Sequence, residues 1–143
     1  MLIYGEDDTV ANWVADQIPH VSDFGLCAAI GVESCGRLIA GVVYHDWQPE
    51  SHTIQISMAA THPIWAKRKN ISELLGYPFN QLGAYKVWTM TPLDTGKMAL
   101  RVNEHIGFRQ EAVLAHQFGP KRHAVVCRFL RPIRSTSGLR MAP

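Results

Sequence analysis

The segment over residues 98–114 constrains the fold of this chain more than any other. Ala99, Val102 and Ile106 recur at helical spacing, which places one apolar stripe on a short helix. Gly107 follows, at the position where a helix end favours a residue that can adopt a left-handed conformation. The pattern therefore predicts a helix that ends at a glycine and passes directly into a strand.

The composition indicates one globular domain. The 143 residues are enough for a single hydrophobic core, and 47% of them are hydrophobic and 18% charged. A net charge of +2, spread along the chain, is too mild to indicate a nucleic-acid binder, and we expect none. We find no apolar run long enough to span a bilayer and no signal-peptide pattern at the first residues. We therefore expect a cytoplasmic protein that does not enter a membrane.

The cysteines and histidines do not form a recognisable metal or disulfide motif. Cys27, Cys35 and Cys127 are odd in number and widely spaced, which is typical of reduced thiols in a cytosolic protein. His116 and His123 flank an expected turn, but they lack ligand spacing and a third partner. We expect neither a disulfide nor a metal site.

The rest of the chain alternates between strand and helix patterns. Strands are expected over residues 2–4, 24–32, 38–44, 52–60, 86–90, 108–116 and 123–130. Helices are expected over residues 10–18, 65–82 and from Asp94 or Thr95 to 106, with caps at residues 7–9 and a bend at Gly76 and Pro78. Residues 46–51 read as a loop, and residues 132–143 as a mobile tail after a single domain over 1–131. This order predicts an α+β domain with a mixed, mostly antiparallel curved sheet and helices on both faces.

A helix that closes on Ile-Gly-Phe108 and continues into Arg-Gln-Glu-Ala-Val-Leu resembles the C-terminal half of the GNAT acyl-CoA N-acyltransferase superfamily. The order of expected elements is also that of the GNAT fold, with one first helix where many members have two. The run Tyr-Pro-Phe-Asn-Gln-Leu-Gly over residues 77–83 is similar to compact RimJ-like or phage-encoded acetyltransferases. The resemblance covers residues 24–131 and implies the GNAT fold and the use of acetyl-CoA.

The resemblance also implies where acetyl-CoA binds. In the family, the cofactor lies where the fourth and fifth strands part, with pantetheine on the edge of the fourth strand. Its pyrophosphate lies at the N-terminus of the next helix, where free N–H groups and the helix dipole favour anions. Transferred to this chain, the cofactor-binding residues are Ser57, Met58, Ala59, Ala60, Lys67, Arg68, Lys69, Asn70, Ile71 and Ala99.

The phosphate loop departs from the family pattern. The two signature glycines fall on Lys69 and Ile71, and glycine is what allows a backbone to approach a phosphate closely. The run Lys-Arg-Lys over residues 67–69 supplies positive charge that compensates for their loss. The alternatives are a solvated basic turn and a nucleic-acid site, which would need a broader basic face.

The last helix departs from the family as well. An asparagine that often touches the cofactor is Gly96 here, and the tyrosine that donates to the leaving thiolate is Asn103. Ala99 and Asn103 share one helix face at this spacing. The Asn103 amide can stabilise a thiolate but cannot act as a general acid. The alternative is an ordinary polar residue on a helix.

Acetyl transfer to an amine requires a group that removes a proton. Many family members place a glutamate on the fourth strand, and the nearest match, Gln55, cannot take a proton. His45, His52 and Glu33 stand at expected strand ends near the site, and an imidazole titrates near neutral pH. We take His45 as the catalytic candidate, with a surface or structural histidine as the alternative.

These observations predict an N-acetyltransferase that transfers acetyl from acetyl-CoA directly to a primary amine of a small molecule or protein. The loss of both loop glycines, the asparagine and the tyrosine favours an alternative. In that alternative, the chain is a catalytically silent GNAT-fold module that binds a protein partner or a CoA-like ligand. The antiparallel edge strands also permit a homodimer.

Overall fold

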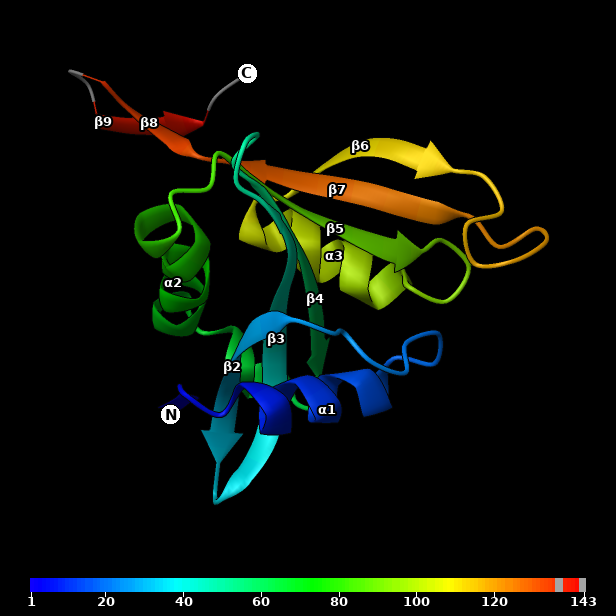
Figure 1. The fold of residues 1–143 in the computed structure, drawn as a ribbon, viewed down its shortest axis with the longest axis horizontal. Coiled ribbons are helices and arrows are strands. Elements are labelled where there is room, and N and C mark those ends of the chain that lie inside the picture. The colour runs from blue at the N-terminus through cyan, green and yellow to red at the C-terminus, as the bar shows by residue number, and fades with distance from the viewer. Residues whose placement is uncertain (136–137, 142–143) are drawn as a thin grey trace.

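The computed structural model describes residues 1–135 and 138–141, in which a seven-stranded sheet carries helices on both faces (Figure 1). The strands lie in the order β1-β2-β3-β4-β5-β7-β6, and every neighbouring pair is antiparallel except β4 and β5. In chain order the elements of this domain are β1 (Leu2–Ile3), α1 (Asp7–Gln17), β2 (Cys27–Ser34), β3 (Arg37–Gln48), β4 (Thr53–Ala60), η1 (Pro63–Ala66), α2 (Arg68–Gly76), η2 (Tyr77–Gln81), β5 (Lys86–Pro92), α3 (Lys97–Ile106), β6 (Arg109–Leu114) and β7 (Ala124–Leu130). The mixed, mostly antiparallel sheet that the sequence predicts is therefore confirmed.

Each face of the sheet has its own apolar core, because side chains alternate along a strand. On one face α1 packs through Val10 and Val14 against Val43 of β3, and all three are fully buried. On the other face α2 and α3 pack over the central strands, where Ile54 and Ile56 are 2% exposed. Burial of each such side chain stabilises the fold by about 1.5–3 kcal/mol.

The predicted helix, glycine and strand over residues 98–114 is present. Helix α3 ends at Ile106, and Gly107 takes a φ of 125° that a side chain would strain. The amide N–H groups of Gly107 and Phe108 both donate to the carbonyl of Asn103, at 3.1 and 2.9 Å. Phe108 is 3% exposed and opens the path into β6.

Two helix starts differ from the sequence prediction. The residue that precedes α1 is Glu6, without a side-chain cap, and the carboxylate of Asp7 instead accepts from the amide of Ala29 in β2 at 3.0 Å. Helix α3 begins after Gly96 rather than at Asp94 or Thr95. The Asp94 carboxylate accepts from Arg122 Nε at 2.9 Å, so at both helix starts a tertiary contact takes the side chain that local rules assign to a cap.

Strand β3 is longer than predicted and runs through the residues expected to form a loop. Its pairing with β4 shifts register between His45 and Gln48, and Asp46 there has a φ of 54°. This β-bulge lets the strand resume after the irregularity. The expected loop at residues 46–51 is therefore partly strand.

The middle helix differs in detail from the prediction of one bent helix over residues 65–82. A 3-10 turn, η1, comes first, α2 follows, and the chain then continues as the π-helical segment η2. Pro78 lies at the start of η2, and its missing N–H group removes one α-helical hydrogen bond. The predicted bend takes the form of a change in hydrogen-bonding pattern.

Strands β8 (Pro132–Ser135) and β9 (Gly138–Met141) pair with each other as a separate two-stranded ladder, drawn at the upper left of Figure 1. The domain limit at residue 131 and a mobile tail over 132–143 stay predictions from sequence, and part of that tail, residues 136–137 and 142–143, lies outside the described residues. In the part of the chain that is described, we find no helix with the length and hydropathy needed to cross a membrane.

Candidate active site

The two central strands β4 and β5 part in the middle of the sheet. They pair for three residues each, and the last pair joins Gln55 to Trp88. Beyond it β4 stays paired with β3 and β5 with β7, and the two strands diverge like the arms of a V (Figure 1). No strand within the described residues pairs with the facing edges, so their N–H and C=O groups are open to another partner.

The four β4 residues assigned to the cofactor lie along this open edge. They follow the last β4–β5 pair and run to the end of the strand as Ser57, Met58, Ala59 and Ala60. Met58 points to the α2 side and packs against the larger core, whereas Ala59 packs on the α1 side. The edge therefore offers backbone groups, while the side chains cover the two faces. Their role toward acetyl-CoA stays a prediction.

The basic run lies at the start of α2, as the sequence predicts. Lys67 precedes the helix, Arg68 is its first residue, and all three side chains of residues 67–69 are exposed. Among the described residues, these three cations take part in no ion pair, and the first turn of α2 contains no acidic residue. Cations are disfavoured at this positive helix end unless an anion binds there.

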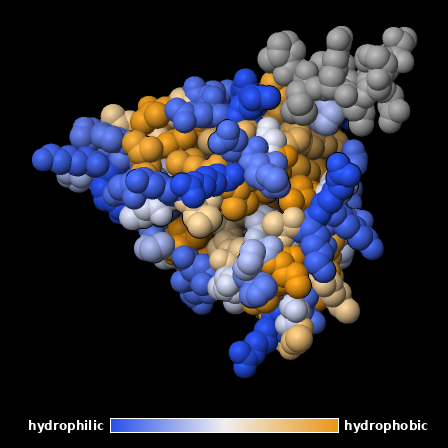
Figure 2. All heavy atoms as spheres, turned by 180° about the vertical axis from the view of Figure 1, so that it is seen from behind, coloured by the Kyte–Doolittle hydropathy of each residue, from blue (hydrophilic) through white to orange (hydrophobic). Residues whose placement is uncertain are grey.

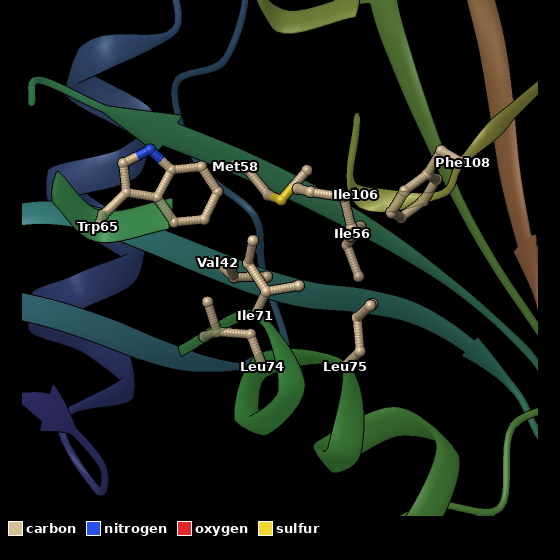
Figure 3. A pocket seen from close by; sticks show the side chains of 9 residues that line it. All are labelled: Val42, Ile56, Met58, Trp65, Ile71, Leu74, Leu75, Ile106 and Phe108. Carbon is tan, nitrogen blue, oxygen red and sulfur yellow. The ribbon is translucent and has the colours of Figure 1, made fainter. Parts of the chain in front are cut away.

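Asn70 and Ile71 have structural contacts in the same turn. The Asn70 amide donates to the carbonyl of Trp65 at 3.0 Å and so fixes the passage from η1 into α2. Ile71 faces an apolar cavity of about 10 Å³ between the two helices and the sheet (Figure 3). The side chains that line it are Val42, Ile56, Met58, Trp65, Ile71, Leu74, Leu75, Ile106 and Phe108. A cavity of this size holds at most one water molecule, so these residues form a packed core.

The reverse side of the molecule carries separate apolar patches that hydrophilic side chains interrupt (Figure 2). Two large exposed apolar side chains of the protein are Leu26, which is 99% exposed, and Met98, which is 70% exposed. They belong to different segments, the turn before β2 and the start of α3. Exposed apolar side chains scattered in this way are ordinary on a protein surface.

Asn103 lies on the buried side of α3 and is 2% exposed. We find no hydrogen bond from its side-chain amide to any described residue, so this buried donor is not used within the described part of the chain. Ala99, one turn earlier, is exposed, so the two residues that were expected to share a face differ in burial.

His45, the candidate base, is brought against Ser57. Its Nε2 lies 2.9 Å from Ser57 Oγ, and its Nδ1 lies 3.0 Å from the carboxylate of Asp46. The His45 side chain is 11% exposed, and its ring packs on Phe24 with 5.2 Å between centroids. Gln55 stands directly opposite His45 in the β3–β4 register and is 9% exposed. The sequence identified His45 and Ser57 separately but did not predict their contact.

The other two base candidates lie elsewhere. Glu33 pairs with Leu38 at the opposite end of the β2–β3 hairpin from His45. His52 is exposed, and its carbonyl accepts from the amide of Tyr85 at 2.7 Å, which anchors the start of β5. Glu33 is thus remote from the opening, and His52 lies at the end where β4 and β5 are still paired.

Three further histidines hold turns together. His123 Nδ1 accepts from the amide of His116, and His116 Nδ1 accepts from the amide of Lys121. His20 stacks on Phe118 with 4.3 Å between ring centroids, which joins the turn after α1 to the turn before β7. Burial there lowers the pKa of His20. Within residues 1–135 and 138–141 we find no group of three or more His, Cys, Asp or Glu side chains that could hold a metal ion.

No family model and no curated protein matches the sequence of this chain. Solved structures match its fold. A structure of glutamate-to-glutamine mutant forms of the spermidine/spermine N-acetyltransferase SpeG from Vibrio cholerae is 15% identical with a TM-score of 0.73, over 92% of this chain and 94% of that chain. The same enzyme in complex with manganese ions is 16% identical with a TM-score of 0.68, over 91% of each chain.

A dodecameric structure of spermidine N-acetyltransferase from Vibrio cholerae, in an intermediate state, is 21% identical with a TM-score of 0.62. That match covers 75% of this chain and 66% of the other. The match to the F149A mutant of the same enzyme also covers 66% of the enzyme's length. Identities this low establish the architecture and leave the activity open. From the parted strands, the strand order and these neighbours together, the chain has the GNAT fold.

Proposed function

We propose that this chain is an acetyl-CoA-dependent N-acetyltransferase that transfers the acetyl group directly to a primary amine of a small molecule or protein. The observation that carries the proposal is the parting of β4 and β5 after three residue pairs. A pantetheine arm carries amide groups that can pair with the open backbone edge of β4 as an added strand would. The structural neighbours are N-acetyltransferases by name, which supports the same reaction class here.

The basic turn at the start of α2 supports a site for the cofactor's phosphates. The exposed side chains of Lys67, Arg68 and Lys69 surround a helix end whose first N–H groups have no intrahelical partner. Each cation at this end costs about 0.3–1 kcal/mol through the helix dipole. A bound diphosphate would offset that cost. The three cations would then hold the diphosphate by charge, where other family members use the backbone of the loop glycines.

The reaction forms a C–N bond and breaks a C–S bond. The neutral amine attacks the thioester carbonyl, and a tetrahedral intermediate then expels the CoA thiolate. The amide of Asn103, which is 2% exposed on α3, would donate to that thiolate. His45 would remove the proton of the amine, so no covalent enzyme intermediate is required.

Titration calorimetry with acetyl-CoA and with CoA tests the cofactor site. We expect Arg68→Glu to weaken binding at least tenfold, which corresponds to about 1.4 kcal/mol. Arg37→Glu is the matched control, because Arg37 is exposed at the β2–β3 hairpin and its reversal should leave affinity unchanged. Equal affinity of the Arg68 variant and the wild type would refute the phosphate role. Absence of wild-type binding at millimolar acetyl-CoA would refute the proposed function.

A specific observation favours the alternative of a catalytically silent module that binds a protein partner or a CoA-like ligand. Lys69 and Ile71 replace the family's two loop glycines. Apolar side chains fill the space beside Ile71 and leave only a cavity of about 10 Å³. Release of free thiol in the presence of an amine distinguishes the two functions, because a silent module produces none.

A RimJ-like or phage-encoded subtype, a cytoplasmic location and a homodimer stay predictions.

A further inference from the structure

A hydroxyl, an imidazole and a carboxylate form a continuous hydrogen-bonded chain at the parted strands. Ser57 Oγ lies 2.9 Å from His45 Nε2, and His45 Nδ1 lies 3.0 Å from Asp46 Oδ2. We propose that Ser57, His45 and Asp46 form the proton-accepting chain that deprotonates the amine acceptor. This inference rests on the proposed function and names the groups that perform its proton transfer.

The chemistry of the partners fixes the direction of the chain. The carboxylate of Asp46 can only accept a hydrogen bond, so His45 Nδ1 must carry the proton. In the neutral imidazole, Nε2 then has a free lone pair and accepts from the Ser57 hydroxyl. The Ser57 hydroxyl is thus polarised toward His45, and its lone pairs are left for an incoming donor.

The β-bulge in β3 is what brings the carboxylate onto the ring. Consecutive residues of a regular strand point to opposite faces, so His45 and Asp46 would normally be separated. Asp46 instead has a φ of 54°, and the register with β4 shifts at this point. A non-glycine residue held in this region costs on the order of 1–3 kcal/mol, and such strain is often found at functional sites.

The surroundings hold the ring in place. The His45 side chain is 11% exposed and packs against Phe24, whereas the Asp46 side chain is 65% exposed. The imidazole is therefore confined between its two hydrogen bonds while the carboxylate remains solvated. This is the arrangement of a base that a third group orients.

The position of the chain matches the expected meeting point of the two substrates. Ser57 is two residues beyond Gln55, the last β4 residue that pairs with β5, and side chains two apart share a face. The Ser57 hydroxyl therefore lies beside the opening between the strands, where the proposed function places the thioester. Gln55 on the same face cannot take a proton, whereas His45, which Ser57 contacts directly, can.

The proton transfer balances without a further reactant. The ammonium form of the acceptor gives a proton to Ser57 Oγ as the Ser57 proton passes to His45 Nε2. The resulting imidazolium is paired with Asp46, and the free amine attacks the thioester carbonyl. Ser57 ends the step as a neutral hydroxyl, so it acts as a relay and not as a nucleophile.

Kinetics with two classes of acceptor tests the proposal, after wild-type activity has been measured. An aliphatic amine is an ammonium ion at neutral pH, whereas an aromatic amine is already neutral. We expect His45→Gln to lower kcat/KM for an aliphatic amine by about 100-fold or more, the usual size of general-base catalysis. For an aromatic amine the loss should be below about tenfold, and the acetyl-CoA Kd from calorimetry should not change. Ser57→Ala and Asp46→Asn should likewise lower kcat/KM more for the aliphatic amine than for the aromatic amine.

The matched control is His105→Gln, because His105 is exposed in the last turn of α3 and away from this chain. Equal losses of the His45 variant with both acceptors would assign His45 a structural role and overturn the proposal. A loss below tenfold with the aliphatic amine would overturn it as well. An inactive wild type would instead refute the proposed function.

Nitrogen NMR of the His45 ring provides a readout independent of turnover. The proposal requires the neutral tautomer protonated at Nδ1 in the wild type, because Asp46 accepts from that atom. A ring protonated at Nε2 would overturn the proposal in a fully active enzyme. The two measurements thus separate a failure of the proton chain from a failure of the acetyltransferase assignment.

Discussion

Gly96→Ala tests whether the close approach of α3 to β5 excludes a side chain at the start of the helix. A Cβ atom at Gly96 would lie 2.3 Å from Thr91 Cγ2 and 2.4 Å from the carbonyl oxygen of Pro92. Both distances are far below the contact distance of about 3.5 Å, and the oxygen belongs to the backbone and cannot rotate away. The amide of Gly96 also donates to that oxygen at 2.9 Å, so moving the helix outward breaks this bond.

The magnitude follows from these contacts. Overpacking of a well-packed site costs about 1–3 kcal/mol, and a lost hydrogen bond adds about 1 kcal/mol. Replacement of glycine reduces the entropy of the unfolded chain, which offsets about 0.4–1 kcal/mol. We therefore expect Gly96→Ala to lower the free energy of unfolding by about 2 kcal/mol, and Tm by roughly 4–8 °C for a domain of this size.

Urea and thermal unfolding measure the effect, with Gly76→Ala as the control. Gly76 has a φ of −60°, and an added Cβ would meet nothing closer than Asn80 Nδ2 at 3.5 Å. The control should therefore be stabilised by about 0.4–1 kcal/mol. If Gly96→Ala is as stable as Gly76→Ala, the claim that the contacts with Thr91 and Pro92 exclude a side chain at Gly96 is wrong. Gly96→Asn, which restores the family residue, should for the same reason bind acetyl-CoA no more tightly than wild type.

Three further measurements test other contacts. Burial lowers the pKa of His20, so the unfolded chain binds this proton more readily; its contribution to stability is full above about pH 6.5 and is lost on acidification. The free energy of unfolding should therefore fall less steeply from pH 7 to 5 in His20→Gln than in the wild type. Parallel pH dependences of the two proteins would contradict this. Asn103→Ala should lower kcat more than acetyl-CoA affinity, and equal losses in both would refute the thiolate role. Tyr44→Phe removes a buried 2.6 Å bond from the hydroxyl to the Leu74 carbonyl and should cost about 1–3 kcal/mol in urea unfolding. The control Tyr4→Phe removes an exposed hydrogen bond from the hydroxyl to the Glu73 carboxylate and should change the free energy of unfolding by less than about 0.5 kcal/mol.

The parts of the fold that the sequence predicts well are those that local chemistry determines. The apolar stripe of α3 and the glycine after it specify a helix, its end and the next strand without help from the rest of the chain. The end of β4 is similarly predicted at residues 61–63, whereas the helix expected from residue 65 begins as the 3-10 turn η1 and becomes α2 only at Arg68. Strand order along the sheet follows from the resemblance to the GNAT superfamily, since periodicity does not reveal which strands are neighbours.

The candidate site was predicted less completely, because it depends on tertiary contacts. Asp46 looks like a loop residue locally, yet pairing with β4 carries β3 past it through a bulge. That bulge creates the contact between His45 and Asp46, which strand alternation alone would exclude. The replacement of the family asparagine by Gly96 is explained by the tight turn between β5 and α3, where an added Cβ would meet Thr91 and the Pro92 carbonyl.

The parted strands impose a free-energy requirement that bears on what binds there. From residue 56 of β4 and residue 89 of β5 onward, one edge of each strand lacks a strand partner in the described part of the chain. A buried N–H or C=O group left unpaired costs about 1–3 kcal/mol, so water or a ligand must satisfy these edges. Ile106 and Phe108 lie beside Ile56 and Met58 of β4 in the packed core on one side of the opening (Figure 3), and β4 and β5 already part in this structure after the pair Gln55–Trp88. A linear molecule with spaced amides can then pair without moving either strand, and a preorganised site of this kind spends little of its binding energy on rearrangement. An acyl-CoA analogue whose pantetheine amides are replaced by methylenes should therefore bind much more weakly, although its phosphates are intact.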